Sequence, residues 1–161
     1  MHIVHGNLIA HEMNRMKSFT FHTAVIDDKP IILQLLKENH LPYEDISDSM
    51  LQEYRIAKEK NLIIGCIGIQ RDAEFALLRS FCIQNSYRNL GIGKTIYSML
   101  ENECKSNGIK ELYLLTSTAE SFFLKRGFLT IDRTNAPEFL KNSSEFQYVC
   151  PTSAFCMKKI I

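Results

Sequence analysis

The sequence predicts an α/β (α+β) fold: a mixed, mostly antiparallel central sheet of about six to seven strands, with helices on both faces. Short apolar or alternating runs separated by turn residues recur through the first half of the chain, which is typical of antiparallel strands. One long amphipathic segment then lies between two apolar strands, which indicates a parallel crossover. The length of 161 residues and the 45% hydrophobic content suit a single domain with a substantial core.

The first strand and helix are expected soon after the N-terminus. Residues 19–25 alternate aromatic and polar side chains, which predicts a strand. Asp27 or Asp28 can cap the helix that follows, and Pro30 is tolerated in its first turn. The apolar face of this helix is expected to contain Ile31, Ile32, Leu35 and Leu36.

Three strands joined by tight turns are expected next, after a short helical piece at 46–51. The turn residues are Lys60-Asn61 and Arg71-Asp72-Ala73. Such short connections make neighbouring strands antiparallel. The predicted strands cover 53–58, 62–70 and 74–84.

The second half of the chain is expected to alternate helices and strands. Its clearest helix covers 91–106 and ends at Asn107-Gly108. Its apolar face repeats at helical spacing through Ile92, Ile96, Met99, Leu100 and Cys104. The remaining elements are expected to be a strand at 111–116, a helix at 118–125 that stops at Gly127, a strand at 128–133, a helical turn at 137–141 and a strand at 154–160.

Composition narrows the classes of function. The 19 basic and 18 acidic residues give a net charge of +1, which argues against a nucleic-acid binder. No apolar run approaches the roughly 20 residues of a membrane span. The five cysteines contain no CxxC pair and most lie in apolar runs, so reduced thiols in a cytoplasmic protein are expected. The histidines lack metal-ligand spacing, so no metal site is expected. Residues 1–18 are interpreted as an N-terminal extension of a domain at 19–161.

A glycine-containing turn between a strand and the long helix is the most informative segment. Glycine allows the main chain to approach a ligand closely, and a helix start offers unpaired N–H groups that suit a pyrophosphate. A Walker A loop would need glycine at Arg88, and a dinucleotide-binding loop would need it at Ile96. A structural turn and a site for a phosphate-bearing ligand therefore both remain open. The segment consists of Arg88, Asn89, Leu90, Gly91, Ile92, Gly93 and Lys94.

This segment resembles the Arg/Gln-x-x-Gly-x-Gly/Ala signature of the GNAT (GCN5-related) N-acetyltransferase superfamily. The Gly127-Phe128 pair and the order of elements from Phe19 to Ile160 are similar to that family too. The resemblance implies acetyl-CoA as co-substrate, with the loop binding its pyrophosphate. It also implies that the main chain of the preceding strand pairs with pantetheine. The contacts that it implies beyond the loop are Phe81, Cys82, Ile83, Thr116, Phe122 and Phe123.

A more specific resemblance lies near the C-terminus. Glu145-Phe146 and the segment 150–157, together with 76–80 and 112–116, are similar to a GNAT subfamily named for arsenic-resistance operons. That subfamily resembles amino-acid N-acetyltransferases. The implied reaction is direct transfer in a ternary complex to a small amine, an amino acid or a similar compound. The resemblance is compatible with a homodimer.

The chemistry needs an amine that loses a proton, a stabilised oxyanion and a leaving thiolate. An α-amino group has a pKa of about 7.7–8.0, so its deprotonation at neutral pH is easy. Main-chain N–H groups near Phe81–Ile83 are the expected oxyanion donors. The tyrosine that many GNATs use as acid is replaced by Phe123. Tyr97 and Tyr113 are expected nearer the core.

Three charged side chains are candidates for the acceptor site or for structural pairs. Glu145 is the preferred polar site residue, whereas Glu74 is expected to be a solvated turn charge. Arg79 lies inside an apolar strand and could clamp a substrate carboxylate or pair with a buried acid such as Glu53. Strand alternation places Ser80 on the opposite side from Arg79.

Two alternatives to the enzyme remain open. A GNAT-fold module could bind CoA or a metalloid without turnover, because the usual tyrosine is absent. Cys150 and Cys156 raise the metalloid hypothesis, although burial as structural thiols is favoured. A nucleotide phosphotransferase acting through Gly91-Ile92-Gly93-Lys94-Thr95 is a weaker hypothesis.

Overall fold

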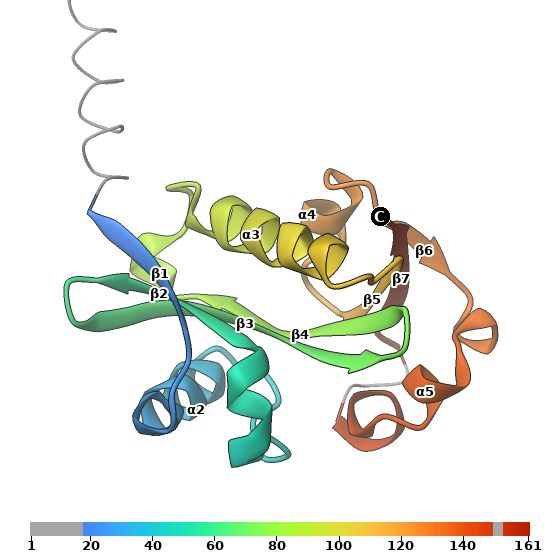
Figure 1. Cartoon of the computed structure of the whole chain (residues 1–161), viewed down its shortest axis with the longest axis horizontal. Helices are drawn as coiled ribbons and strands as arrows, with labels where there is room; N and C mark the ends of the chain where they lie inside the picture. The colour runs from blue at the N-terminus through green and yellow to red at the C-terminus, as the bar shows by residue number, and fades with distance from the viewer. Residues whose placement is uncertain (1–17, 150–152) are drawn as a thin grey trace, which may run out of the picture.

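A seven-stranded sheet forms the centre of the protein (Figure 1). The structure is a computed structural model that describes residues 18–149 and 153–161. Residues 1–17 of the predicted extension therefore lie outside the described residues. The strands are β1 (Phe19–Thr23), β2 (Tyr54–Glu59), β3 (Leu62–Asp72), β4 (Phe75–Ile83), β5 (Glu111–Thr116), β6 (Leu129–Ile131) and β7 (Phe155–Ile160).

Four α-helices and several single turns of helix connect the strands within the described residues. The α-helices are α2 (Lys29–Glu38), α3 (Ile92–Ser106), α4 (Glu120–Leu124) and α5 (Glu138–Lys141). The shorter turns are η1 (Ile26–Asp28), η2 (Asp48–Glu53), η3 (Asn85–Tyr87), η4 (Arg133–Asn135) and η5 (Glu145–Val149). In the described part of the chain, no helix is both long and apolar enough to cross a bilayer.

The strand order is β1-β2-β3-β4-β5-β7-β6, and β4 and β5 form the parallel pair. The other neighbours pair antiparallel. The long helix α3 connects β4 to β5, as its amphipathic pattern predicts. The mixed, mostly antiparallel sheet expected from the sequence is thus confirmed.

Helices cover both faces of the sheet (Figure 1). On one face, α3 and α4 pack against a core that includes Ile96, Leu100 and Phe123. On the other face, α2 and α5 lie over two smaller clusters, in which Leu36 and Leu140 are fully buried. The fold therefore buries apolar surface on both sides of one sheet, which is the layer arrangement expected for this class.

Some sequence expectations need correction. Ile31 and Met99 were assigned to apolar helix faces, yet they are 48% and 37% exposed. Each lies at the margin of its helix stripe, where the sheet no longer covers it. The π-helical turn Glu145–Val149 was not expected, because its sequence shows no helical repeat. The helix at 118–125 and the strand at 128–133 are shorter than expected.

A bulge in β4 decides which way its polar side chains point. The pairing passes from Cys66↔Cys82 to Gly68↔Arg79, so two residues of β4 lie opposite one residue of β3. Ser80 has a φ of 55°, which is rare for a residue with a side chain. The expected alternation between Arg79 and Ser80 is therefore wrong. Arg79 pairs with Asp45 and Ser80 with Tyr54, both of which belong to the side covered by α2.

Candidate functional site

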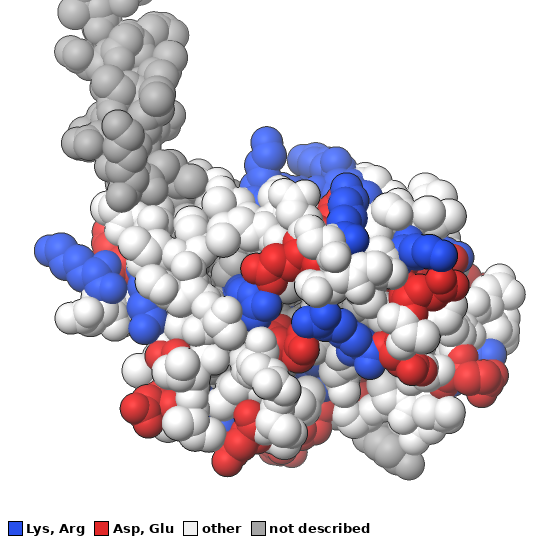
Figure 2. All heavy atoms as spheres, in the orientation of Figure 1, with Lys and Arg blue, Asp and Glu red and all other residues white. Residues whose placement is uncertain are grey.

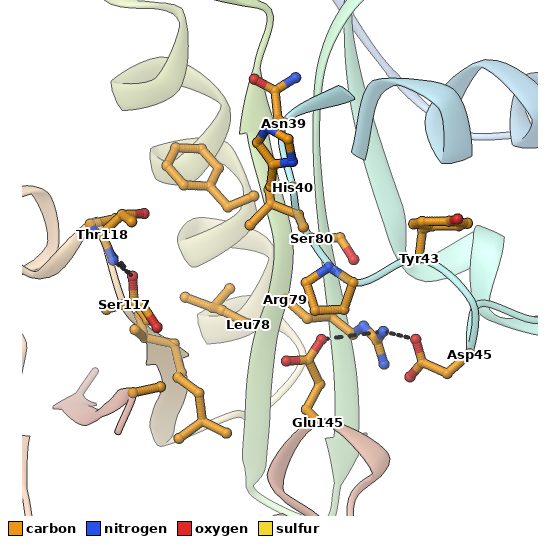
Figure 3. Close-up of a pocket in the computed structure, with 18 of the residues that line it drawn as sticks. Asn39, His40, Tyr43, Asp45, Leu78, Arg79, Ser80, Ser117, Thr118 and Glu145 are labelled. Carbon is orange, nitrogen blue, oxygen red and sulfur yellow. Dashed lines mark hydrogen bonds and ion pairs between the residues drawn. The ribbon is translucent and has the colours of Figure 1, made fainter. Parts of the chain in front are cut away.

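A cavity of about 1100 Å³ opens where β4 and β5 separate (Figure 3). The two strands pair from Phe75↔Glu111 to Leu78↔Leu114, whereas β4 continues to Ile83. From this last pair onward, residues of both strands line the cavity. β4 contributes Leu78, Arg79, Ser80 and Phe81, and β5 and the turn after it contribute Leu114, Leu115, Thr116, Ser117, Thr118 and Ala119.

Phe81 and Phe123 line the cavity on the side of α3 and α4, and Phe122, outside this lining, packs against both rings. The ring of Phe81 lies 5.1 Å from that of Phe122 and 5.7 Å from that of Phe123, between centroids. Phe123 is 3% exposed. A Cβ on Gly93 would lie 3.2 Å from Cζ of Phe81, so glycine allows α3 to pack tightly on this ring. Phe81 thus links the cavity to the start of α3.

The glycine turn before α3 presents its main chain rather than its side chains. Gly91 caps the helix with a φ of 81°, and Asn89 has a φ of 62°. The side chain of Ile92 is 1% exposed, and Leu90 packs against the same core. Lys94 is exposed. Both positive φ angles turn the chain sharply before the helix, which favours glycine at position 91.

Arg88 holds this turn in place. Its Nε donates to the carbonyl oxygen of Ile83 at 3.0 Å, and a terminal nitrogen donates to Oδ1 of Asn39 at 2.8 Å. Asn39 ends α2, so one guanidinium connects the end of β4, the turn and α2. These hydrogen bonds of Arg88 position the loop.

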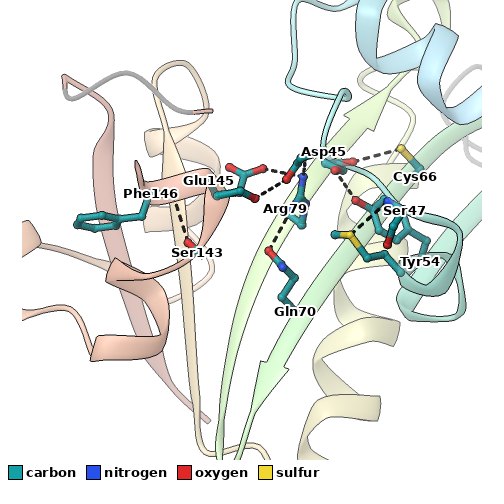
Figure 4. Close-up of polar contacts among 12 residues, drawn as sticks. Asp45, Ser47, Tyr54, Cys66, Gln70, Arg79, Ser143, Glu145 and Phe146 are labelled. Carbon is teal, nitrogen blue, oxygen red and sulfur yellow. Dashed lines mark hydrogen bonds and ion pairs between the residues drawn. The ribbon is translucent and has the colours of Figure 1, made fainter. Parts of the chain in front are cut away.

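A second cluster of polar side chains lies on the α2 side of the cavity (Figure 4). Arg79, with a fully buried side chain, pairs with Asp45 at 2.6 Å and with Glu145 at 3.3 Å. Its other terminal nitrogen donates to Oε1 of Gln70 at 3.0 Å. Ser144 donates to Oδ2 of Asp45 at 2.6 Å. Two segments from distant parts of the chain therefore meet at one arginine of β4.

Electrostatics in this cluster favour the ionised carboxylate of Asp45. Burial alone would raise its pKa, but hydrogen bonds from Arg79 and Ser144 outweigh burial and lower it below the ordinary 3.8. The neighbouring Tyr54 is fully buried, and burial raises its pKa to about 12. Its hydroxyl lies 2.7 Å from that of Ser80 and stays neutral at physiological pH. Asp45 thus carries a fixed negative charge beside a neutral phenol.

The other charged residues considered from the sequence, Glu53 and Glu74, pair with residues other than Arg79. Of the two alternatives for Arg79, the structure shows the pair with protein acids, but Glu53, named as an example, is the wrong acid because it pairs with Arg71 at 2.6 Å. Arg79 instead takes the acids Asp45 and Glu145. Glu74 pairs with Lys110 at the surface, as expected of a turn charge.

The tyrosines and cysteines considered as reactive groups lie in the core. Tyr97 and Tyr113 are each 3% exposed, as expected. The Tyr97 hydroxyl hydrogen-bonds to Glu101. Cys156 is buried in β7, which agrees with a structural thiol. Cys150 lies outside the described residues.

Sequence reasoning missed Asp45 and Ser144. Asp45 lies 34 positions from Arg79, and Ser144 lies 99 positions from Asp45. Helical and strand periodicity relate only residues close together in the sequence, so neither could have indicated these contacts. The one available signal was the cost of burying Arg79, which called for a carboxylate from the substrate or the protein without showing which residue supplies it.

Comparisons with known proteins agree with this geometry. A family model described as an acetyltransferase (GNAT) domain matches residues 33–146. The amino-acid acetyltransferase of Pseudomonas syringae pv. tomato is 26% identical over 112 residues, which cover 64% of this chain and 26% of that protein. The chain thus spans about a quarter of the length of this curated relative.

Solved structures share the fold. N-acetylglutamate synthase from Neisseria gonorrhoeae, complexed with coenzyme A and N-acetyl-glutamate, has a TM-score of 0.77 at 17% identity, with 88% of this chain and 35% of that chain covered. Rv2747 from Mycobacterium tuberculosis, in complex with CoA, has a TM-score of 0.74 at 20% identity, with 88% and 99% covered. At these identities the likeness concerns the fold.

Proposed function

Because the chain belongs to the GNAT acetyltransferase family, whose co-substrate is acetyl-CoA, we propose that it acetylates the amine of an amino acid or amino-acid-like compound. The observation that carries the proposal is the cavity between the separating strands β4 and β5, next to the glycine turn. The amino-acid acetyltransferase relatives support this class of acceptor.

The glycine turn is proposed to bind the pyrophosphate of CoA. Main-chain N–H groups at the start of α3 supply the donors, and the dipole of this 15-residue helix favours the negative charge. The pantetheine arm would follow the main chain of Phe81, Cys82 and Ile83, beyond the point where β5 leaves β4. Thr116, Phe122 and Phe123 would also contact the cofactor.

Transfer is proposed to be a direct attack of the neutral amine on the thioester. Holding both substrates in one cavity supplies the entropic part of the acceleration. Main-chain N–H groups near Phe81 stabilise the oxyanion. Glu145 lines the cavity and is proposed to accept the proton of the amine. Phe123 cannot donate a proton, so the thiolate leaves as an anion or takes a proton from water.

Arg79 is proposed to contribute indirectly, through its ion pairs with Asp45 and Glu145. A substrate carboxylate would have to displace Asp45 or Glu145 to reach the terminal nitrogens of this guanidinium. Arg79 is therefore a positioning residue, which holds Asp45 and Glu145 at the cavity wall, rather than a direct clamp.

A thiol-release assay with acetyl-CoA and a panel of amino acids and amines tests the proposal. Turnover with at least one α-amine is expected, together with calorimetric binding of CoA. Binding of CoA without transfer to any acceptor would favour a sensor module, a hypothesis motivated by the buried Phe123. The absence of both acetyl transfer and CoA binding would refute the proposed function.

The cellular setting is also a proposal. The resemblance to GNATs of arsenic-resistance operons suggests a role in arsenic resistance, and the cysteine usage suggests a cytoplasmic protein. A homodimer is compatible with the family resemblance. Comparing the arsenic tolerance of cells with and without this protein tests the first point, cell fractionation tests the second, and the molecular mass from sedimentation tests the homodimer.

A further inference from the structure

Helix α2 ends in a turn that favours glycine, and this position holds a histidine. The N–H of His40 donates to the carbonyl of Lys37 at 3.1 Å, and the N–H of Leu41 donates to that of Leu36 at 2.9 Å. These two bonds form a Schellman motif, whose left-handed residue is most often glycine. His40 has a φ of 57°, a conformation that costs free energy for a residue with a side chain. The stability of the turn alone therefore does not explain a histidine here.

Residues held in such conformations cluster at functional sites. Besides His40, the described residues other than glycine with a positive φ are Lys60, Ala73, Ser80 and Asn89. Lys60 and Ala73 lie in exposed hairpin turns outside the cavity lining. Of these five residues, only His40 and Ser80 line the cavity. The imidazole of His40 is exposed there, and no hydrogen bond or ion pair links it to another described residue.

Seven consecutive residues that follow α2 line the cavity, and the two ends of this segment contact different parts of β4. At its first residue, Asn39, the side chain accepts from Arg88, which also donates to the carbonyl of Ile83. At its last residue, Asp45, the partner is Arg79. The segment therefore runs along the strand, from the end of β4 toward its middle.

His40 directly follows Asn39, so it lies toward the end of β4 that leads into the glycine turn. In the view of Figure 3, Ser80 separates His40 from Arg79 and its acids. The proposed pantetheine arm enters from the glycine turn and runs toward Phe81, with its acetyl group foremost. The thioester sulfur would then lie on the His40 side of the acetyl group, and the amine would approach from the side of Arg79.

We propose that His40 protonates the thiolate of CoA as it leaves, a step that Phe123 cannot serve. This inference rests on the proposed function. The amine nitrogen bonds to the acetyl carbon, the carbon–sulfur bond breaks with its electron pair on sulfur, and the imidazolium proton passes to that sulfur. The amine loses its own proton to the base proposed above. Imidazole exchanges protons readily at neutral pH, so water restores both groups before the next turnover.

Replacement by glycine separates catalysis from folding at this position. His40→Gly removes the imidazole and suits the left-handed backbone, so the variant should be at least as stable as the wild type in urea. Its kcat is expected to fall by about 100-fold or more, the low end of the range for a positioned acid. Its calorimetric affinity for CoA should stay close to that of the wild type, because the glycine turn is intact.

Two further variants serve as controls. Lys60→Gly makes the same backbone change at a φ of 54°, in the turn between β2 and β3, and should leave kcat unchanged. His40→Gln keeps a polar side chain of similar size that cannot release a proton at neutral pH. It should therefore be as slow as His40→Gly.

A change of leaving group distinguishes protonation from positioning of the substrate. A selenolate is a weaker base than a thiolate and needs less help from an acid as it leaves. The loss of kcat in His40→Gly should therefore shrink severalfold when acetyl-seleno-CoA replaces acetyl-CoA. A residue that only positions the substrate would give the same loss with both acetyl donors.

The outcomes separate this inference from the proposed function. If the wild type acetylates no acceptor, the proposed function is refuted and the inference with it. If the wild type is active, an unchanged kcat in His40→Gly, or an equal loss with the thioester and the selenoester, would overturn the inference alone.

Discussion

At the scale of single residues, backbone conformation explains why glycine stands at the start of α3. Gly91 has a φ of 81°, where a side chain costs about 1–2 kcal/mol. Gly108, at the end of the same helix, has the same φ, and a Cβ there would meet nothing within 4 Å. The two glycines thus share a conformational requirement but differ in location. Only Gly91 adjoins the proposed pyrophosphate site.

This pair of glycines permits a matched test of the CoA loop. Gly91→Glu and Gly108→Glu should both lower the free energy of unfolding by about 1–2 kcal/mol, because both place a side chain at positive φ. Only Gly91→Glu should weaken CoA binding, by more than tenfold, because its carboxylate repels the pyrophosphate. Calorimetric titration with CoA measures the difference. Equal CoA affinities in the two variants would contradict the assigned loop.

The carboxyl of Asp45 makes stability depend on pH. Its pKa is lower in the folded protein than its ordinary 3.8, despite the opposing effect of burial, because Arg79 and Ser144 donate hydrogen bonds to it. The stabilisation is therefore fully present well above pH 3.8 and is lost as the pH falls toward the folded pKa.

Comparison with Asp45→Asn should reveal this contribution. The wild type is expected to be the more stable protein at neutral pH, and the difference should shrink as the pH falls below 3.8. Urea titrations across this pH range measure it. A difference that stays constant would show that Asp45 contributes through its shape rather than its charge.

At the scale of elements, the bulge in β4 determines the site. It turns Arg79 and Ser80 toward the same side, and the strand then leaves β5. The Ser80 conformation is strained, and strain of this kind persists where surrounding contacts hold it. The hydrogen bond to Tyr54 and the Cys66 thiol, which donates to the Ser80 carbonyl at 3.2 Å, are such contacts.

A double-mutant cycle measures how strongly the bulge is held. Tyr54→Phe and Ser80→Ala should each destabilise the fold by about 1–3 kcal/mol, because each leaves a buried hydroxyl or its partner unsatisfied. The double variant should lose less than the sum, with a coupling of about 1 kcal/mol. Denaturant midpoints give these values. Strict additivity would mean that the hydrogen bond does not stabilise the bulge.

At the scale of the whole molecule, helices on both sheet faces bury the described thiols. Cys66, Cys82, Cys104 and Cys156 are all buried and free. Burial raises the pKa of Cys82 and of Cys104 to about 11, with Arg88 partly opposing it at Cys82. Charged side chains of both signs are mixed over the face shown in Figure 2. The four thiols lie beneath the surface, in the packed interior.

Native thiols should consequently react slowly. In a Cys150→Ser background, the four buried thiols should react with an aromatic disulfide reagent only at the rate of opening of the fold, because the thiolate is the nucleophile. Absorbance of the released thiolate, followed with and without urea, measures this. Rapid reaction of any of the four in the native protein would contradict the packing.

Much of the architecture follows from local sequence patterns. Alternation and helical periodicity predicted the strands and α3, because the burial of one face imposes these repeats on the sequence. The glycine turn and the Gly127-Phe128 pair indicated the family before any geometry was known. The position of Arg79 inside an apolar strand predicted a carboxylate partner from either the substrate or the protein, because an unpaired guanidinium is costly to bury.

The sequence by itself determined the order of elements, the sheet class and the loop that marks a GNAT domain. Only the tertiary structure decided that Asp45 and Glu145 meet at Arg79, and that a bulge turns Ser80 to the same side. Both outcomes depend on contacts between segments far apart in the chain. Local periodicity shows which face of a helix or strand a residue occupies. Which residues meet Arg79 depends instead on how the complete sheet packs with the segments that cover it.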